Sequence, residues 1–378
     1  MRRIYLDHNA TTPLLPEAFE AMAGVLKDRF GNPSSSHSPG REARALVDRA
    51  RREVAGLIGA RPSTIVFTSG GTEADHLALG GVLKEGDHVV TSSIEHHAVL
   101  DELRELERSG TIELTEVPVG SDGVVDPGAM LGALRDDTAL VSLMFANNET
   151  GVVQPIDAVG AGCRSRGIPF HSDAVQAVGK LPIDVGSLPV DLLSLSAHKF
   201  GGPKGVGGLY LRRGFRLRPL RHGGEQERRL RPGTENVSGI VGMGVAARVV
   251  GEELETEAGR IRKLRDTFET ELAGRLPDAH VNGAGADRVP NTTSVTIYGV
   301  DAEALLLLLD MEGIAVSAGS ACTTGAAAPS HVLTAMGLDS RQAADTLRIA
   351  WGRVNDANDP PVLLRTLMSA VQSLGREQ

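Results

Sequence analysis

Seven short apolar runs, separated by segments long enough to form helices or turns, constrain the fold of this chain more than any other feature. The runs are TIVFT, HVVTS, TIELTEV, ALVSLMFA, IPFHS, DLLSLS and GGLYL, between Thr64 and Leu211. This alternation predicts a mostly parallel, doubly wound seven-stranded sheet flanked by helices, an α/β fold. Ligands of such sheets bind at the carboxyl ends of the strands, where the loops begin. The residues that follow each run are therefore the candidates for a functional site.

The rest of the chain predicts a second, smaller α+β unit. A long helix begins near Ser238, and beyond it lie the apolar runs TTSVTIY and TLRIAWG and the loop SAGSACTTGAAAPSHV. We expect a large domain over residues 14–255, and a small domain made of residues 1–13 and 256–378. Further helices are predicted over residues 16–30, 41–59, 302–311 and 361–374.

The composition excludes several classes of partner. A net charge of −9 over 378 residues argues against a nucleic-acid ligand, which would favour a basic stripe. No run approaches the roughly 18 to 20 apolar residues of a membrane span, and the N-terminus lacks the apolar region of a signal peptide. We therefore expect a cytoplasmic protein without a membrane partner. Two cysteines, Cys163 and Cys322, are too few for a disulfide framework or a metal knuckle.

The first strand is followed by SGGTEADH, a glycine turn that opens a helix at Gly71 and Thr72. Unsatisfied backbone N–H groups and the helix dipole make such a turn a seat for phosphate. A capped helix without a ligand is an equally good interpretation. The segment is not a Walker A loop, because no GK[ST] follows.

Other polar residues follow the next strands. His96 could serve as an acid, a base or a stacking ring, or be structural, and Asn147 and Asn148 could orient a ligand or cap a turn. Asp173 and Gln176 share a face if a helical turn begins there, and this pair suits a cationic ring nitrogen and its neighbouring oxygen, although Asp173 could also be an N-cap.

The sixth run ends at Ser196, His198 and Lys199, before a glycine-rich turn. A lysine that acts as a nucleophile or base near neutral pH needs a pKa lowered by burial or by a neighbouring cation. Successive strand ends thus offer a phosphate seat, a histidine ring, an amide, a carboxylate and a lysine. This combination is what pyridoxal 5′-phosphate requires, namely a Schiff-base lysine and a partner for the pyridinium nitrogen.

Several ordered motifs identify a family resemblance. YLDHNATTP, GNPSSSHS, SGGTEADH, EHHAVL, NNETGVVQPI, HSDAVQAVGK, SAHKFGGPKGVG, RPGTEN and SAGSACTTGAAAPSHVL resemble the cysteine desulfurases of the NifS/IscS type. These enzymes belong to the class V aminotransferase superfamily, with the fold of the fold-type I pyridoxal phosphate enzymes. The resemblance extends from about Tyr5 to Arg353.

The resemblance implies a role for each matching residue. Lys199 would be the Schiff-base lysine, Asp173 the partner of the ring nitrogen, and His96 a ring that stacks on the cofactor and shuttles protons. Arg348 and Asn32 would bind the substrate carboxylate, for which the bidentate arginine fork is suited. Gln176 and Asn148 would contact the ring oxygen, and Asn148 would also lie near the substrate. The phosphate would be held by Gly71, Thr72, Ser196 and His198. Thr234 from the second subunit of a homodimer would join them.

Cys322 would accept the sulfur of L-cysteine as a persulfide, leaving L-alanine, and pass it to an acceptor such as an iron–sulfur scaffold or another thio-cofactor or thionucleoside pathway. It could also be a transient iron–sulfur ligand, and no other metal site is expected. Cys163 is predicted to be a buried structural cysteine. Two departures from the family pattern are His76, where asparagine is usual, and the end of the chain at LGREQ without the longer tail of housekeeping members.

Three other functions fit parts of the pattern. A selenocysteine lyase would share the cofactor site, and a class V aminotransferase would share it without needing a loop thiol. A non-catalytic sulfur-relay scaffold would need none of Lys199, Asp173, His96, Cys322 and Arg348, so their presence argues against it.

Overall fold

The computed structural model describes residues 2–318 and 329–375, and its main feature is the predicted seven-stranded sheet. Six neighbouring pairs join the strands in the order β2-β8-β7-β6-β5-β3-β4. Strand β8 is antiparallel to both of its neighbours, β2 and β7, and therefore runs opposite to the rest of this sheet. The strands are β2 (Ile65–Thr68), β3 (Asp87–Ser92), β4 (Ile112–Val117), β5 (Thr138–Ser142), β6 (Phe170–Asp173), β7 (Leu192–Ser196) and β8 (Gly207–Leu211). Each coincides with one of the seven apolar runs, so the predicted fold class is confirmed.

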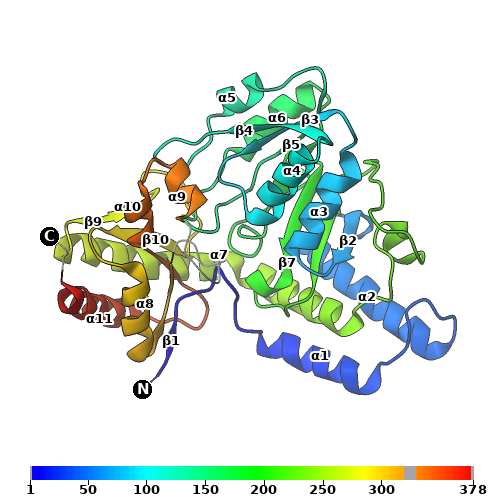
Figure 1. Cartoon of the computed structure of the whole chain (residues 1–378). Coiled ribbons are helices and arrows are strands. Elements are labelled where there is room, and N and C mark those ends of the chain that lie inside the picture. The colour runs from blue at the N-terminus through cyan, green and yellow to red at the C-terminus, as the bar shows by residue number, and fades with distance from the viewer. Residues whose placement is uncertain (1, 319–328, 376–378) are drawn as a thin grey trace.

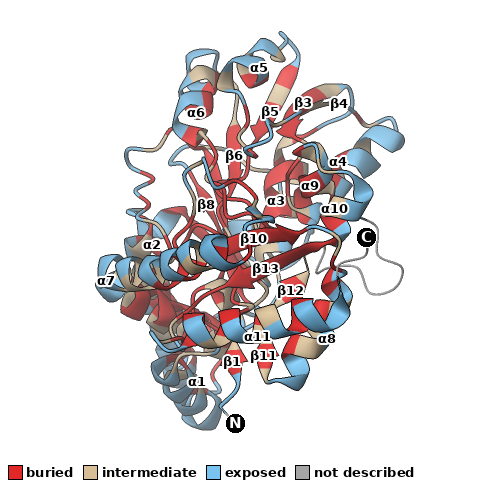
Figure 2. Ribbon diagram, turned by 90° about the vertical axis from the view of Figure 1, so that its left-hand side faces the viewer, coloured by how far each residue is buried: buried red, intermediate tan, exposed pale blue. Residues whose placement is uncertain are grey.

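Side chains alternate between two apolar layers along these strands. Ile65 and Phe67 of β2 belong to the large core that also holds residues of α2 (Ser38–Leu57) and α7 (Val237–Arg275). Val66, between them, packs with residues of α3 (Gly71–Val82) on the opposite face. This period of two is what a sheet covered by helices on both faces requires, and Figure 2 shows its strands as the most buried part of the molecule.

Helices connect the parallel strands. The helix α4 (His97–Arg108) joins β3 to β4, and α6 (Ile156–Ser165) joins β5 to β6. The carboxyl ends of β3, β5, β6 and β7 therefore meet at one edge of the sheet, which is where the sequence places its polar candidates. The remaining elements of this part are α1 (Pro16–Asp28), α5 (Pro127–Gly132) and the 3-10 turns η1 (Pro62–Thr64), η2 (Ala197–Lys199) and η3 (Gln226–Arg229).

The helix predicted over residues 41–59 begins earlier in the structure, because α2 starts at Ser38. His37 caps this helix because its Nδ1 accepts a hydrogen bond from the backbone N–H of Gly40 at 3.3 Å. Proline fits the first turn of a helix, where its missing N–H is not needed.

A smaller sheet, in the order β12-β13-β10-β9, forms beside the large one. Trp351 and Phe268 pack in its apolar core, with ring centroids 5.9 Å apart. The 39-residue helix α7 runs from the large sheet to this core. The smaller part contains β9 (Ala279–Val281), β10 (Thr292–Ile297), β11 (Ile314–Ala315), β12 (Ser317–Ala318), β13 (Thr346–Ala350), α8 (Ala302–Met311), α9 (His331–Ala335), α10 (Ser340–Ala344) and α11 (Asp359–Leu374).

The N-terminal segment connects the two sheets. Its strand β1 (Ile4–Tyr5) pairs in parallel with β11. A few residues later, Asn9 donates a hydrogen bond to the backbone oxygen of Asn148 at 3.1 Å, and Thr12 donates one to the backbone oxygen of His198 at 2.9 Å. This segment therefore passes directly beside the carboxyl ends of β5 and β7.

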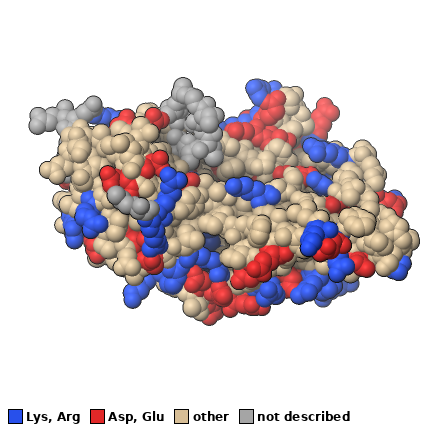
Figure 3. All heavy atoms as spheres, turned by 90° about the horizontal axis from the view of Figure 1, so that it is seen from below, with Lys and Arg blue, Asp and Glu red and all other residues tan. Residues whose placement is uncertain are grey.

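Among the residues that the structure describes, no helix is long and apolar enough to cross a membrane. On the face shown in Figure 3, Lys and Arg side chains lie interspersed with Asp and Glu side chains.

Candidate active site

A cavity of about 290 Å³ lies at the carboxyl ends of the parallel strands. Most of the residues predicted for the site line it, although they come from six separate stretches of the chain. These residues are Gly71, Thr72, His96, Asn148, Asp173, Gln176, Ser196, His198, Lys199 and Arg348. The cavity is completed by Asn9, Ala10, Asp75, Met144 and Val175, to which the sequence analysis assigned no role.

The N-terminus of α3 forms one wall of the cavity. Gly70, which precedes this helix, has an extended φ of 166°, and no side chain caps the helix. The first backbone N–H groups of an α-helix have no partner within the helix, so those of α3 are available to an anion. A Cβ at Gly71 would lie only 2.7 Å from Cγ2 of Val175, so glycine allows the start of α3 to pack closely against that side chain. These features favour the phosphate seat over a capped helix.

Asp173 ends β6, and its carboxylate is buried on the floor of the cavity. Its Oδ1 accepts a hydrogen bond from the backbone N–H of Val175 at 2.8 Å. Burial raises the pKa of this carboxyl to about 6, against the effects of the Val175 hydrogen bond and of the nearby Lys199 cation. Asp173 does not cap a regular helix, because the next α-helix in the chain is α7. A buried carboxylate of this kind is suited to a cationic ring nitrogen.

Gln176 lies beside Asp173, and its amide is held by groups that the sequence analysis did not identify. Its Nε2 donates to the backbone oxygen of Asn9 at 2.9 Å, and its Oε1 accepts from Nζ of Lys180 at 2.5 Å. Lys180 also donates to Oδ1 of Asn9 at 2.9 Å. Burial lowers the pKa of Lys180 well below its usual value. The motif DHNATT contains Asn9, but only the tertiary structure brings it to Lys180.

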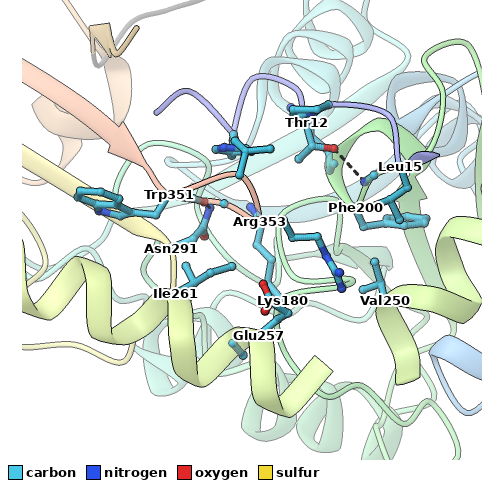
Figure 4. Close-up of a pocket in the computed structure, with 18 of the residues that line it drawn as sticks. Thr12, Leu15, Lys180, Phe200, Val250, Glu257, Ile261, Asn291, Trp351 and Arg353 are labelled. Atoms are coloured by element: carbon cyan, nitrogen blue, oxygen red, sulfur yellow. Dashed lines mark hydrogen bonds between the residues drawn. The ribbon is translucent and has the colours of Figure 1, made fainter. Parts of the chain in front are cut away.

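Lys199 lies in η2, directly after β7. Its Nζ donates to the backbone oxygen of Asn9 at 2.5 Å and to that of Ala10 at 3.0 Å, so the amine lies against the N-terminal segment. Lys199 also borders a second cavity of about 150 Å³, whose wall is mainly apolar. Figure 4 shows the second cavity with labelled wall residues that include Thr12, Leu15, Phe200, Val250, Ile261 and Trp351. Lys199 is therefore half-buried, with one polar and one mainly apolar cavity beside it.

Two histidines in the cavity are neutral at physiological pH. Burial and the Lys199 cation lower the pKa of His96 to about 4 and that of His198 to about 4. His96 is the N-cap of α4, and its Nδ1 accepts from the backbone N–H of Ala98 at 3.1 Å. The adjacent His97 is more exposed and contacts Asp101 at 3.1 Å. Only one histidine of the pair borders the cavity.

Arg348, from β13 of the smaller sheet, reaches the same cavity. Its side chain is 4% exposed, and its Nη2 lies 2.8 Å from Oδ1 of Asp7. Its Nη1 donates to the backbone oxygen of Asn148 at 3.3 Å, whereas its Nε has no hydrogen-bond partner among the described residues. A guanidinium that lines the cavity and is held in place by Asp7 is suited to bind a carboxylate of a small substrate.

The lining fits pyridoxal phosphate in its chemistry. The uncapped start of α3 and the hydroxyl groups of Thr72 and Ser196 suit the phosphate. Asp173 suits a protonated ring nitrogen, and Lys199 can form the Schiff base that holds the cofactor. By contrast, no group of three or more His, Cys, Asp or Glu side chains that could hold a metal ion occurs within residues 2–318 and 329–375.

Three predicted site residues do not line this cavity. Asn32 is exposed, and its Oδ1 accepts from the backbone N–H of Ser34 at 2.9 Å. Thr234 is exposed, and its predicted contact with a second subunit stays a prediction. Cys322 lies outside the described residues, and its role stays a prediction. Cys163 is fully buried, and burial raises the pKa of its thiol to about 12, in keeping with a structural role.

Comparison with known proteins decides the family. The sequence profile of the Aminotransferase class-V family matches residues 4–360. The chain belongs to this family. Its members depend on pyridoxal phosphate, in agreement with the lining of the cavity.

Similar proteins cover almost the whole chain. Cysteine desulfurase IscS of Dictyoglomus turgidum is 46% identical over 99% of this chain and 95% of its own length. A solved NifS-like protein is 38% identical, with a TM-score of 0.91 over 99% of this chain and all of the other. A structure of SspA in complex with cysteine is 35% identical, with a TM-score of 0.81 over 92% of this chain and 98% of the other.

Proposed function

We propose that this member of the class V family is a pyridoxal phosphate-dependent cysteine desulfurase, which removes sulfur from L-cysteine to give L-alanine and a persulfide on Cys322. The observation that carries the proposal is the convergence of Lys199, Asp173, His96 and Arg348 on one cavity. Relatives named cysteine desulfurase that span nearly the whole chain support the choice of substrate.

Different side chains would bind different parts of the cofactor. When bound, pyridoxal phosphate supplies an electron sink for bonds at the substrate Cα. Asp173 would hold a negative charge for the ring nitrogen, and Gln176 and Asn148 would contact the ring oxygen. Gly71, Thr72, Ser196 and His198 hold the phosphate, with Thr234 of a second copy of this chain. Lys199 would anchor the cofactor, and its amine would be the base for the proton on the substrate Cα.

The substrate is oriented by its carboxylate. Arg348 is already directed by Asp7, so the guanidinium can take a carboxylate without first losing side-chain freedom. Asn32 and Asn148 complete this contact in the proposal. His96 is neutral at physiological pH, because burial lowers its pKa to about 4, so it can stack on the ring and accept a proton.

The sulfur leaves by attack of the Cys322 thiolate on the substrate sulfur. A new S–S bond forms while the C–S bond breaks, and the carbon fragment keeps the electron pair and takes up protons to become alanine. One cysteine and one enzyme thiol thus give one alanine and one persulfide, and no outside oxidant is needed.

We also propose the setting in which the reaction takes place. The protein would work in the cytoplasm as a homodimer and pass the persulfide sulfur to an acceptor protein such as an iron–sulfur scaffold. The exposure of Thr234 on a single chain and the names of the IscS relatives support this part of the proposal.

The test uses the two cysteines as a matched pair. Replacement C322A should abolish cysteine-dependent persulfide formation while leaving the absorbance of the bound cofactor unchanged. The control C163A should keep both, because burial raises the pKa of that thiol to about 12 and it cannot supply a thiolate at neutral pH. Alanine and sulfide would be measured with L-cysteine and with L-selenocysteine. Persulfide formation that survives in C322A, or turnover of selenocysteine alone, would contradict the proposal.

A further inference from the structure

A layer of buried polar side chains lies behind Asp173, between the sheet and α3. His171 is two residues before Asp173 on β6, so both side chains project from the same face of the sheet. Ser142 of β5 is paired with His171, and Ser194 of β7 is paired with Asp173. Asp75 of α3 packs against this group and also borders the cavity. All of these side chains are at most 5% exposed.

These side chains are connected in series, from Ser142 through His171 and Ser194 to Asp75. Nδ1 of His171 lies 2.9 Å from Oγ of Ser142, and its Nε2 lies 3.0 Å from Oγ of Ser194. The Ser194 hydroxyl also faces the carboxyl group of Asp75, where it lowers the pKa of that carboxyl. Oδ1 of Asp75 has no hydrogen-bond partner among the described residues and lies 3.6 Å from Nε2 of His171.

Asp75 and Asp173 cannot both be charged at low cost, because two buried carboxylates that interact strongly share a proton. Their surroundings decide which one keeps it. Asp173 accepts a backbone hydrogen bond from Val175 and lies near the Lys199 cation. Burial raises the pKa of Asp75, the neighbouring carboxyl groups of Asp173 and Glu95 raise it further, and among the described residues the Ser194 hydroxyl is the group that opposes them. Asp75 is therefore the better holder of the proton.

The protonation state of Asp75 determines which group donates and which accepts at each step from Asp75 to Ser142. Burial lowers the pKa of His171 to about 3, so its ring is neutral, with one nitrogen that donates and one that accepts. If Asp75 is protonated, its O–H donates to Ser194, Ser194 donates to Nε2 of His171, and Nδ1–H of His171 donates to Ser142. If Asp75 is ionised, Ser194 must donate to it, and His171 must instead carry its hydrogen on Nε2.

We propose that Asp75 is a positioning residue for the cofactor site: it holds a proton beside ionised Asp173, and through Ser194 it fixes His171 as the Nδ1–H tautomer. A neutral Asp75 leaves Asp173 as the single negative charge of this buried layer, opposite the ring nitrogen. The purpose of the arrangement rests on the proposed function, but the tautomer of His171 can be measured without cofactor or turnover.

The test is the ¹⁵N spectrum of ring-labelled histidine in the cofactor-free full-length protein, with H171Q to assign the signal. In the wild type, His171 should be the Nδ1–H tautomer at neutral pH, and D75N should keep it, because an asparagine N–H also donates to Ser194. In D173N the competing charge is gone, so the change to Nε2–H should occur about one pH unit or more below its wild-type position. An Nε2–H tautomer in the neutral wild type, or a tautomer that D173N does not shift, would overturn the proposal.

Two variants of the cofactor-loaded enzyme give an independent readout. D75N should keep the pH dependence of the cofactor absorbance and most of kcat/KM, because it imitates a neutral Asp75. D75L has a similar size but no donor for Ser194, and it should shift that pH dependence and weaken cofactor binding by about tenfold or more. A D75N variant as impaired as D75L would overturn the proposal. Absence of desulfurase activity in the wild type would refute the proposed function and would leave the tautomer result unaffected.

Discussion

Nη2 of Arg348, on the smaller sheet, lies 2.8 Å from Oδ1 of Asp7 in the N-terminal segment. The same guanidinium donates from Nη1 to the backbone oxygen of Asn148, at the end of the large sheet. One side chain therefore connects three parts of the chain at the edge of the cavity. The contact with Asp7 fixes the orientation of the fork before any substrate arrives.

This orientation predicts how a lysine at position 348 would behave. In R348K the charge is retained but the bidentate fork is lost, so KM for L-cysteine should rise by about tenfold or more while kcat changes less. R353K is the matched control, because Arg353 pairs with the exposed Glu253 outside the cavity. Steady-state alanine release measures both variants. An unchanged KM in R348K would show that the substrate carboxylate binds elsewhere.

Lys199 is the residue on which the proposed cofactor depends most directly. In K199A the Schiff base cannot form, so the purified protein should lack the visible absorbance of the lysine-bound cofactor and should lose turnover by about a thousandfold or more. K204A provides the comparison, since Lys204 is exposed in the same glycine-rich turn and does not line the cavity. Spectra of the two proteins, purified with added cofactor, give the result. If K199A kept the wild-type spectrum, another lysine would form the Schiff base with the cofactor.

The strands and their ends could be predicted from the sequence, because a short apolar run marks each strand and the change to polar or glycine-rich residues marks its end. Apart from the edge strand β4, the apolar runs are buried on both faces, and polar side chains follow in the loops at their carboxyl ends. This logic located Asp173 and Lys199 without any knowledge of their neighbours. It also located Thr72, because a helix that follows a glycine turn starts where the strand stops.

Contacts that depend on the tertiary structure could not be predicted in the same way. Gln176 and Lys180 both donate hydrogen bonds to Asn9, which lies more than 160 residues earlier in the chain. The link from Asp75 to His171 depends on how α3 packs over β6 and β7, and no periodicity in the sequence encodes this packing. Asn32 and Thr234 do not reach the cavity in a single chain, so no property of one chain tests their predicted roles.

The segment before Thr234 contains a buried ion pair that should stabilise the fold. Glu227 accepts from Nη2 of Arg51 at 2.6 Å and from the backbone N–H of Phe67 at 2.9 Å. Its φ of 44° is left-handed, as are those of the next two residues, and such strain persists only where contacts hold it. E227A leaves the Arg51 charge without this partner, so the free energy of unfolding should fall by about 3 kcal/mol.

The matched control is E225A, because Glu225 pairs with Arg229 on the exposed surface of the same turn. Its effect should be about 0.5 kcal/mol or less. Denaturant unfolding of both variants measures the difference. Equal losses for E227A and E225A would mean that the buried pair contributes no more than the exposed one.

Glu149 predicts a pH dependence of stability that can be assigned to one side chain. Its Oε2 accepts from the hydroxyl of Ser330 at 2.5 Å, and burial raises the pKa of its carboxyl from 4.5 to about 7. Between these values the folded protein binds more protons than the unfolded chain, so this group makes the wild type less stable as pH rises from 4.5 to 7. The loss amounts to about 3 kcal/mol at most, and it is complete above pH 7.

In E149Q the amide cannot ionise. Between pH 4.5 and pH 8 the free energy of unfolding of this variant should therefore rise by about this amount relative to the wild type. E312Q, at an exposed position, serves as the control and should show no comparable gain. Urea unfolding of the three proteins across this pH range gives the differences directly, and taking differences cancels the titration of the other buried carboxyl groups. If E149Q and the wild type kept a constant difference in stability over the range, Glu149 would be charged or neutral throughout, and the proposed titration of its contact with Ser330 would be wrong.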